Sequence, residues 1–524
     1  MKAKFGKAIF WLIIISTVIR AVLAYLIEFG NDEVYYWTYA LYPSLSHFDH
    51  PPMVGLMIQL FSLNLHFDSE FAIRLPSIIL GTFDTYLIYL IGKRIKDGLT
   101  GFYAALLYTA SLYGFIIVGV FILPDTPQIF FMLLAVYLFL KTLPVDHIER
   151  KHRGVLCLAG LITGLGMISK YTAIYVWVGI LLYIIFFDRR WLKELTLYVS
   201  GIISIVCLTP VLLWNWENDF ISFTFHGERV DVFKAGLDLD YFFTEIGGEF
   251  LYNNPVVYIL IIIMIVAIIR GKKFVDGKYV KMLMCIGLPI ILTFIGFSLF
   301  RKTLPHWTAP GFVMLIPLTG AWLSDKWRRN LKPVMMPWPL KIALAFTIVT
   351  FLVGVAQINY GIVKLDNTKK YEKLGEDDFS LDMYGWDQVE KQFAQIRKVE
   401  VDSMNISPDA PIIGNKWFPL AHIDYYVARP LDMKVLALGH LVDIHKYAWI
   451  TEERGGLHKG MDAWYITNSR NYTNPRSIYK SYFNSINIVD TIQIERSGKI
   501  EARAFVYLMK DLKKLPKPFH ISKR

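Results

Sequence analysis

Long apolar segments separated by short polar loops make up the first and larger part of the chain. A helix needs about 20 apolar residues to cross a bilayer, and about eleven segments approach this length. They are residues 9–27, 72–92, 99–118, 128–143, 154–168, 172–187, 195–214, 255–269, 282–300, 308–323 and 340–360. The pattern predicts a polytopic α-helical membrane protein with about 11 transmembrane helices.

The loops between these segments alternate between basic loops and loops nearly free of Lys and Arg. The basic loops contain Lys93, Arg94 and Lys96; Arg150, Lys151 and Arg153; Arg189, Arg190 and Lys193; Arg270, Lys272, Lys273, Lys278 and Lys281; and Lys326, Arg328, Arg329 and Lys332. Cytoplasmic loops carry such an excess. We therefore expect a cytoplasmic N-terminus, a first segment retained as a signal anchor, and an extracytoplasmic chain after Tyr360. The two short segments that meet at Ser169 and Lys170 leave the count open, because losing one span would invert the tail.

The composition changes after residue 361, where charged residues, Asn, Ser and Gly are interspersed. We expect two domains, a transmembrane domain over residues 1–361 and a soluble periplasmic domain over residues 362–524. In the soluble domain, the pattern predicts short buried strands at residues 411–414 and 434–438 and an amphipathic helix at residues 386–398. Strands over 492–496 and 503–510, joined through 497–499, complete an α/β domain that we expect to fold alone.

The overall composition supports a membrane protein. Of the 524 residues, 54% are hydrophobic and 19% charged, and the mean hydropathy is +0.40, which excludes a soluble globular protein. The net charge of +11 would suit nucleic acid, but the basic residues lie in the short loops, so we expect no nucleic-acid partner. Cys157, Cys207 and Cys285 lie inside apolar segments, which argues against disulfides and a zinc-thiolate site.

Acids and isolated bases collect in the loops of the expected outer face. Asp32 and Glu33 follow the first apolar segment, and burial of one acid in such a pair raises its pKa, as a general base requires. Asp125 stands between Pro124 and Pro127, where it would also serve as a helix N-cap. For any one of these residues a solvated loop charge is the alternative. Their shared placement indicates an extracytoplasmic active site.

Several cations also lie on this outer side. His226 and Arg229 are three residues apart, hence on one face of a helix. Arg301 and Lys302 break the expected lack of positive charge in outer loops, which points to an anionic ligand. Lys170 lies between two segments, where snorkelling is the alternative. Arg20 and Asp84 lie inside apolar segments, and we expect them to pair with each other rather than to react.

Several motifs in the membrane part resemble one known family. They are N-D-E-V-Y-Y-W, H-F-D-H-P-P, L-P-D-T-P-Q-I-F-F, G-L-G-M-I-S-K-Y-T-A, P-V-L-L-W-N-W followed by F-H-G-E-R-V, and K-T-L-P-H-W-T-A-P. In this order they resemble the GT-C fold, lipid-linked-sugar-dependent membrane glycosyltransferases, in the bacterial branch related to protein O-mannosyltransferases and lipid A aminoarabinose transferases. The tail motifs G-W-D-Q-V-E and G-N-K-W-F are similar to the outer domains of that branch.

The resemblance implies an inverting transfer of a sugar from a polyprenyl-phosphate donor to a lipid, glycan or protein acceptor at the outer face of the bacterial inner membrane. It implies that Asp32 is the catalytic base, with Glu33 beside it, and that Asp125 shapes the cavity. The positions it assigns to the donor phosphate or the cavity wall are Arg229, His50, Lys302, Lys170 and His306. Asp49 and His226 fall where some relatives bind a divalent metal ion, although Asp49 replaces the family's Glu.

Two other functions remain open at this point. A lipid-linked oligosaccharide ligase or polymerase would use the same topology with a larger donor. A transporter or flippase would show repeated halves and ionisable groups near the midplane of the membrane, whereas this chain collects them in outer loops. The sequence contains no nucleotide-binding loop, so no nucleotide cofactor is expected.

Overall fold

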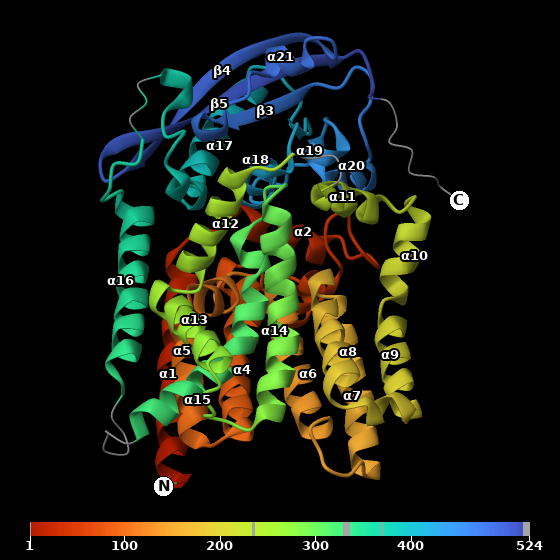
Figure 1. Ribbon diagram of the computed structural model, residues 1–524. Helices are drawn as coiled ribbons and strands as arrows, with labels where there is room; N and C mark the ends of the chain where they lie inside the picture. Colours follow the sequence, from red (N-terminus) through yellow and green to blue (C-terminus); the bar gives the residue numbers. More distant parts are fainter. Residues whose placement is uncertain (1, 233–235, 329–335, 367, 369, 517–524) are drawn as a thin grey trace.

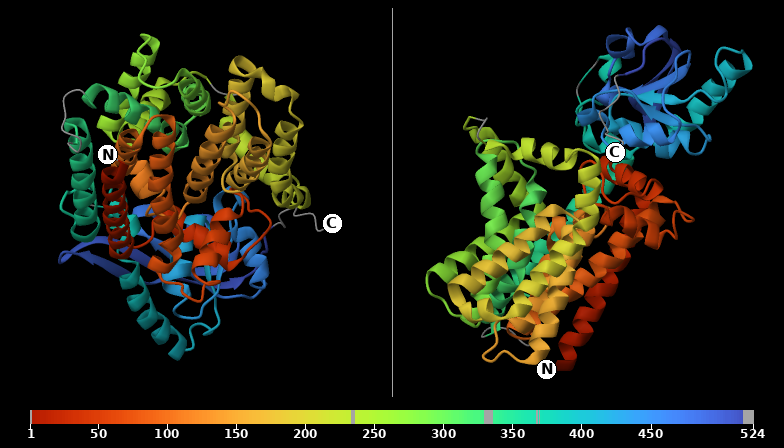
Figure 2. Two further views of the ribbon diagram at one scale, coloured as in Figure 1. Left: turned by 90° about the horizontal axis from the view of Figure 1, so that it is seen from below. Right: turned by 90° about the vertical axis from the view of Figure 1, so that its right-hand side faces the viewer.

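A helical bundle carries the C-terminal domain over one of its ends, and the N-terminus lies at the other end (Figures 1 and 2). The structure is a computed structural model, and it describes residues 2–232, 236–328, 336–366, 368 and 370–516. Arg329 and Lys332, two of the predicted loop cations, lie outside the described residues.

Each predicted apolar segment coincides with a helix or with two consecutive helices. The helices are α1 (Lys2–Leu26), α4 (Glu70–Ile95), α5 (Gly98–Ala110) with η1 (Tyr113–Ile117), α6 (Asp125–Thr142), α7 (Arg150–Met167), η2 (Tyr171–Ile174) with α8 (Tyr175–Phe187), α9 (Leu195–Cys207) with α10 (Thr209–Glu217), α13 (Pro255–Ile269), α14 (Gly277–Ser298), α15 (Ala309–Arg328) and α16 (Trp338–Tyr360). Among the described residues, 4 helices are long and apolar enough to cross a membrane, or up to 6 if each bent pair is one span. The protein is thus polytopic, and the count of about 11 spans stays a prediction.

The basic loops lie together at the end of the bundle that faces away from the C-terminal domain. Lys96 pairs with Asp325 at 3.2 Å, and Arg153 pairs with Glu194 at 2.9 Å. The N-terminus marks the same end in Figure 1. One end of the bundle is therefore basic, as the alternation of the loops predicts, while the assignment of that end to the cytoplasm stays a prediction.

Short helices lie between the bundle and the C-terminal domain (Figure 1). They are α2 (Asn31–Leu41), α3 (Met53–Phe61), α11 (Ile221–Val230), α12 (Leu239–Tyr252) and the short turn η5 (Pro305–Trp307). The chain bends by 104° between α12 and α13, so α12 leaves the direction of the bundle. Five of the outer-face residues singled out in the sequence lie in these elements: Asp32, Glu33, His226, Arg229 and His306.

The two ionisable residues in apolar segments do not form the expected ion pair. Arg20 donates to the hydroxyl of Thr85 at 3.3 Å, and Asp84 accepts from the hydroxyl of Tyr108 at 3.2 Å. Within the described part of the chain, no ion pair joins Arg20 to Asp84. Both side chains are buried, and neighbouring hydroxyl groups replace the direct contact.

The C-terminal domain is built on a sheet with the strand order β2-β1-β3-β5-β4. Its strands are β1 (Ile412–Gly414), β2 (Val435–Ala437), β3 (Ala463–Asn468), β4 (Phe483–Arg496) and β5 (Lys499–Leu512). Its helices are α17 (Trp386–Asp402), α18 (Trp417–His422), η8 (Ile423–Ala428), α19 (Leu441–Ile444), α20 (Tyr447–Glu453) and α21 (Pro475–Tyr479), with short turns η6 (Tyr371–Lys373), η7 (Phe379–Met383) and η9 (Ser469–Asn471). The predicted helix and strands are present, and the β4–β5 hairpin is longer than predicted.

The C-terminal domain shares a hydrophobic core with the first outer loop. One continuous cluster joins Val34 and Trp37 of α2 to Trp386 of α17 and Leu420 of α18. The side-chain ammonium of Lys446 donates to the carbonyl oxygen of Thr38 at 2.9 Å, near the C-terminal end of α2, where the helix dipole favours a cation. This shared core argues against the expectation that the domain folds alone.

Candidate active site

Helix α2 presents the two adjacent acids in different directions. Asp32 and Glu33 lie in its first turn, where negative charge is favoured by the helix dipole. Glu33 accepts a hydrogen bond from the backbone nitrogen of Gly30 at 3.0 Å, which caps the start of the helix. Consecutive residues of a helix point about 100° apart, so only one of the two acids faces outward.

Glu33 is held in a buried ion pair with Arg74 of α4. The guanidinium Nε and Nη2 atoms of Arg74 donate to its two carboxylate oxygens at 2.8 and 2.6 Å. The backbone nitrogen atoms of Ile122 and Gly30 supply one further hydrogen bond to each oxygen, at 3.1 and 3.0 Å. With its acceptor sites filled, Glu33 has little capacity to take a proton from a substrate. The geometry therefore favours a positioning role for Glu33, in place of the catalytic role expected from the sequence.

Arg74 also fixes the end of the first long helix. Its Nη1 atom donates to the carbonyl oxygens of Ala24 and Ile27 at 3.0 and 2.7 Å, where α1 ends. Its guanidinium group lies over the ring of Phe29 at 4.9 Å. One buried cation thus connects α1, α2 and α4, and it places the turn that carries Asp32.

Asp32 is the acid whose carboxylate remains available. Within the described residues its side chain makes no hydrogen bond or ion pair, and it is accessible to water although protein atoms surround it. Burial raises the pKa of the Asp32 carboxyl to about 6, and the negative charge of Asp49 adds to the rise. A carboxylate with free lone pairs and a raised pKa meets the requirements of a general base.

The raised pKa predicts the pH dependence of the reaction. A base acts only when deprotonated, so kcat/KM should rise as the pH increases through about 6 and level off above it, since the pKa of Asp32 is raised to about 6. With the ordinary pKa of Asp, this rise in kcat/KM would be centred at a pH of about 3.9. The measurement is kcat/KM between pH 4 and 8 with the protein in liposomes. A limb centred near the ordinary value for Asp would contradict Asp32 as the base.

Asp125 and Lys170, predicted for different roles, form one buried ion pair. The ammonium group of Lys170 lies 2.7 Å from the Asp125 carboxylate, and the hydroxyl of Tyr113 donates to the second oxygen of Asp125 at 2.8 Å. Each charge is thus neutralised by a partner in the protein. Lys170 is therefore not a free cation for a phosphate, and Asp125 is better suited to hold the shape of the site than to accept a proton.

Burial favours the neutral form of two histidines of the site, His50 and His306. Burial lowers the pKa of His50 to about 3 and that of His306 to about 4. At neutral pH both rings can donate one hydrogen bond each but carry no charge. The assignment of His50 and His306 to the donor phosphate or the cavity wall stays a prediction, and as neutral rings they would bind a phosphate through hydrogen bonds.

Asp49 and His226 come together, but not as a set of metal ligands. The hydroxyls of Tyr35 and Tyr39 donate to one carboxylate oxygen of Asp49 at 2.8 and 2.5 Å. His226 Nε2 is 2.7 Å from the backbone oxygen of Asp49, rather than beside its carboxylate. In the described ranges no group of three or more His, Cys, Asp or Glu side chains could hold a metal ion.

A cationic cavity of about 520 Å³ lies between α11, α12 and the loop after α14. Arg229, Arg301 and Lys302 line it together with Glu228 and Asp238. Arg229 is exposed, and its guanidinium group lies 5.2 Å from the centre of the Trp307 ring. Of the five residues predicted for the donor phosphate, the structure brings Arg229 and Lys302 to this cavity, while His50, Lys170 and His306 do not line it.

Sequence reasoning missed several residues that shape the site. Three of them donate hydrogen bonds to the acids: Arg74 to Glu33, Tyr113 to Asp125 and Tyr39 to Asp49. A fourth, His445 of the C-terminal domain, packs against Phe48 with ring centres 5.1 Å apart. Only Arg74 left a signal in the sequence, as a cation inside an apolar segment at its outer end.

Comparisons with known proteins agree with this architecture. Residues 49–214 match a family described as dolichyl-phosphate-mannose-protein mannosyltransferase. Two crystal structures of ArnT from Cupriavidus metallidurans, in the apo state and bound to undecaprenyl phosphate, have TM-scores of 0.61 and 0.60 at 13% and 14% identity. Each covers 96% of this chain and 98% of the other.

The chain has the GT-C fold of these transferases. The lipid A galacturonosyltransferase RgtD of Rhizobium johnstonii is 21% identical to this GT-C protein over 306 residues, which make up 58% of this chain. The chain thus spans 63% of the length of RgtD. The resemblance found in the sequence is confirmed, and the fold is that of an integral membrane protein.

Proposed function

We propose that this GT-C protein transfers a sugar from a polyprenyl-phosphate donor to an acceptor hydroxyl or phosphate at the outer face of the membrane, with inversion at C1. The observation that carries this proposal is the available carboxylate of Asp32 at the same end of the bundle as the cationic cavity of Arg229 and Lys302. Its relatives add support, since one is named a lipid A galacturonosyltransferase and another binds undecaprenyl phosphate.

The reaction requires a base and a means to stabilise the leaving group. Asp32 takes the proton of the acceptor hydroxyl as the acceptor oxygen bonds to C1 of the sugar. The bond from C1 to the phosphate oxygen breaks at the same time, and the polyprenyl phosphate leaves with the electron pair. Attack opposite the leaving group inverts C1. Arg229 and Lys302 stabilise the charge on the departing phosphate.

Transfer can be tested with the full-length protein in liposomes that contain a radiolabelled polyprenyl-phosphate sugar and total lipid as acceptor. The expected result is label in the acceptor and free polyprenyl phosphate in equal amounts. A flippase would move the donor across the bilayer without cleaving it. A ligase or polymerase would require an oligosaccharide donor in place of the single sugar.

Replacing Arg229 should weaken binding of the donor phosphate. Arg229→Ala removes a charge-assisted hydrogen bond, which is worth roughly 1.5–3 kcal/mol. Arg229→Lys should also lose affinity, because an ammonium group does not reproduce the bidentate fork of a guanidinium group. The measurement is the Kd of a sugar-free polyprenyl phosphate.

The matched control for this measurement is Arg150→Ala, an exposed arginine at the start of α7, at the basic end of the bundle. Its affinity should equal that of the unchanged protein. Equal affinity of Arg229→Ala and the unchanged protein would remove Arg229 from the donor site.

A further inference from the structure

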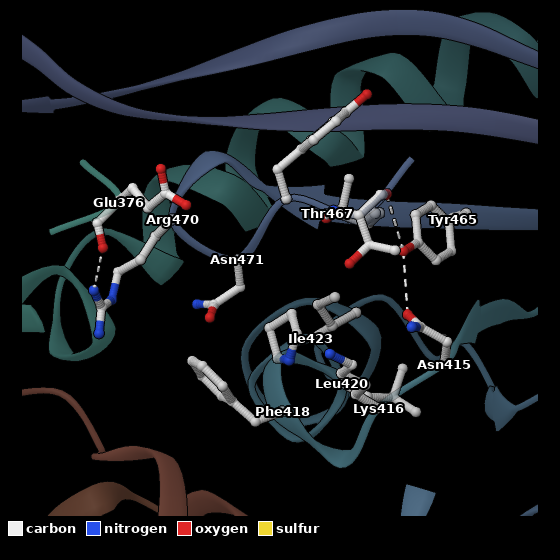
Figure 3. Close-up of a pocket in the computed structure, with 15 residues that line it drawn as sticks. Glu376, Asn415, Lys416, Phe418, Leu420, Ile423, Tyr465, Thr467, Arg470 and Asn471 are labelled. Atoms are coloured by element: carbon white, nitrogen blue, oxygen red, sulfur yellow. Dashed lines mark hydrogen bonds between the residues drawn. The ribbon is translucent and has the colours of Figure 1, made fainter. Parts of the chain in front are cut away.

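A second polar cavity, of about 260 Å³, lies in the C-terminal domain (Figure 3). Its walls come from residues 414–416 at the end of β1 and from residues 465–467 and 470–473 at and after the end of β3. Strand β1 pairs in parallel with β2 on one side and with β3 on the other. Ligands of open α/β sheets bind at the carboxyl ends of parallel strands where the strand order diverges. The cavity occupies this position.

The lining groups are those that recognise a sugar ring. Asn415, Asn471 and Thr467 offer amide and hydroxyl groups, and Phe418 and Tyr472 offer aromatic surface. The Tyr465 hydroxyl donates to the amide oxygen of Asn415 at 3.2 Å, as the dashed line in Figure 3 shows. This bond orients the amide group of Asn415 and leaves its NH₂ available for a ligand.

The size of the cavity limits the ligand. Pockets for drug-sized molecules measure about 300–1,000 Å³, so a cavity of about 260 Å³ fits one sugar ring with its substituents better than a lipid chain.

Among the residues that the structure describes, the charges around the cavity leave one cation, Lys416, without a partner. Glu376 pairs with Lys373 at 2.5 Å, and Arg470 pairs with Asp382 at 2.5 Å. Lys416 is exposed and makes no ion pair or hydrogen bond with any residue that the structure describes. An anionic group on a bound sugar would therefore meet an unneutralised ammonium group.

Helix α18 separates this cavity from the active-site helix α2. Leu420 of α18 lines the cavity, together with Ile423 in the next turn of the chain. Trp417 and His422 of the same helix contact the other side: Trp417 packs on Tyr35 with ring centres 5.1 Å apart, and His422 Nε2 is 3.0 Å from the backbone oxygen of Phe29. The cavity is thus one helix away from the element that carries Asp32.

We propose that this cavity binds an anionic saccharide unit, a sugar that carries a carboxylate or a phosphate group, and that Lys416 contacts the anionic group. The bound unit is part of the acceptor glycan, an assignment that rests on the proposed transferase function. Occupancy of the cavity holds the acceptor next to α2 while its reacting hydroxyl approaches Asp32.

The test is direct binding of galacturonate, glucose 6-phosphate and galactose to the full-length protein in detergent, by calorimetry or saturation-transfer NMR. We expect at least one of the anionic sugars to bind, and the tighter of the two identifies carboxylate or phosphate as the group recognised. The affinity for galactose should be lower than that for the anionic sugar by at least about 10-fold. Lys416→Ala should lower the affinity for the anionic sugar by about 10- to 100-fold. Asn471→Ala should also weaken it.

Lys459→Ala, at an exposed lysine of the same domain that does not line the cavity, is the matched control and should leave the affinity unchanged. Absence of saturable binding to the unchanged protein, or equal affinity in Lys416→Ala, would overturn the inference. Binding should persist in Asp32→Asn, which lacks the proposed base. If the unchanged protein binds the anionic sugar but transfers no sugar from the donor, the transferase proposal alone is contradicted. If it transfers sugar but does not bind the anionic sugar, this inference alone is contradicted.

Discussion

Asp32→Asn is expected to lower the rate of sugar transfer by about 10²–10⁴-fold, the contribution typical of a general base. The amide group of Asn keeps the shape of the side chain but cannot accept the proton of the acceptor. Because Asp32 makes no hydrogen bond or ion pair within the described residues, the substitution breaks no contact that holds the fold. Binding of the polyprenyl phosphate should stay close to that of the unchanged protein, since Arg229 and Lys302 are retained.

The comparison requires transfer rates and donor binding from the same preparations. Asp377→Asn is the matched control, because Asp377 is an exposed acid of the C-terminal domain with no bonded partner among the described residues. It should leave both quantities unchanged. Retention of more than about a tenth of the transfer rate by Asp32→Asn would contradict its role as base.

The helices of the bundle could be predicted from the sequence because the signal is local. A run of apolar residues long enough for a bilayer needs no knowledge of the rest of the chain. The same holds for the β4–β5 hairpin, whose turn is marked by Gly498 with φ of +74°. Strand β3 was not predicted, although it is buried on both faces as β1 and β2 are, because Tyr465, Thr467 and Asn468 interrupt its apolar run.

The partners of the site residues could not be predicted, because they lie far away in the sequence. Asp32 and Glu33 are equivalent in the sequence, and only the position of Arg74, 41 residues beyond Glu33, separates them. The pair of Asp125 with Lys170 likewise spans 45 residues. The sequence therefore indicated which face carries the chemistry, but not which acid keeps free lone pairs.

The shared core between the two domains has the same explanation. The aromatic residues of α2 look like an interfacial helix in the sequence. In the structure Trp37 packs against Tyr425 of the C-terminal domain, with ring centres 5.1 Å apart. The apolar character of a helix face in the sequence does not determine whether lipid or protein covers that face.

Glu33→Gln is expected to cost about 3–5 kcal/mol of stability, the typical cost of removing one partner from a buried ion pair. The guanidinium group of Arg74 is fully buried and would lose its counter-charge. Gln keeps one oxygen that can accept from the backbone nitrogen of Ile122, but its NH₂ group replaces the oxygen that accepts from Gly30 and Arg74 Nη2, so the charge and these two hydrogen bonds are lost together. The measurement is thermal unfolding of the full-length protein in detergent, followed by tryptophan fluorescence. Asp387→Asn, which breaks the exposed Lys391–Asp387 pair, should not change the midpoint.

A double variant separates a positioning role of Glu33 from a catalytic one. Adding Arg74→Met to Glu33→Gln removes the unpaired buried charge, and the midpoint should recover part of its loss, because an uncharged pair avoids the desolvation penalty. Sugar transfer should recover with it, since Asp32 is unchanged and α2 is again held in place. Recovery of the unfolding midpoint without any transfer would show that the carboxylate of Glu33 itself takes part in the reaction.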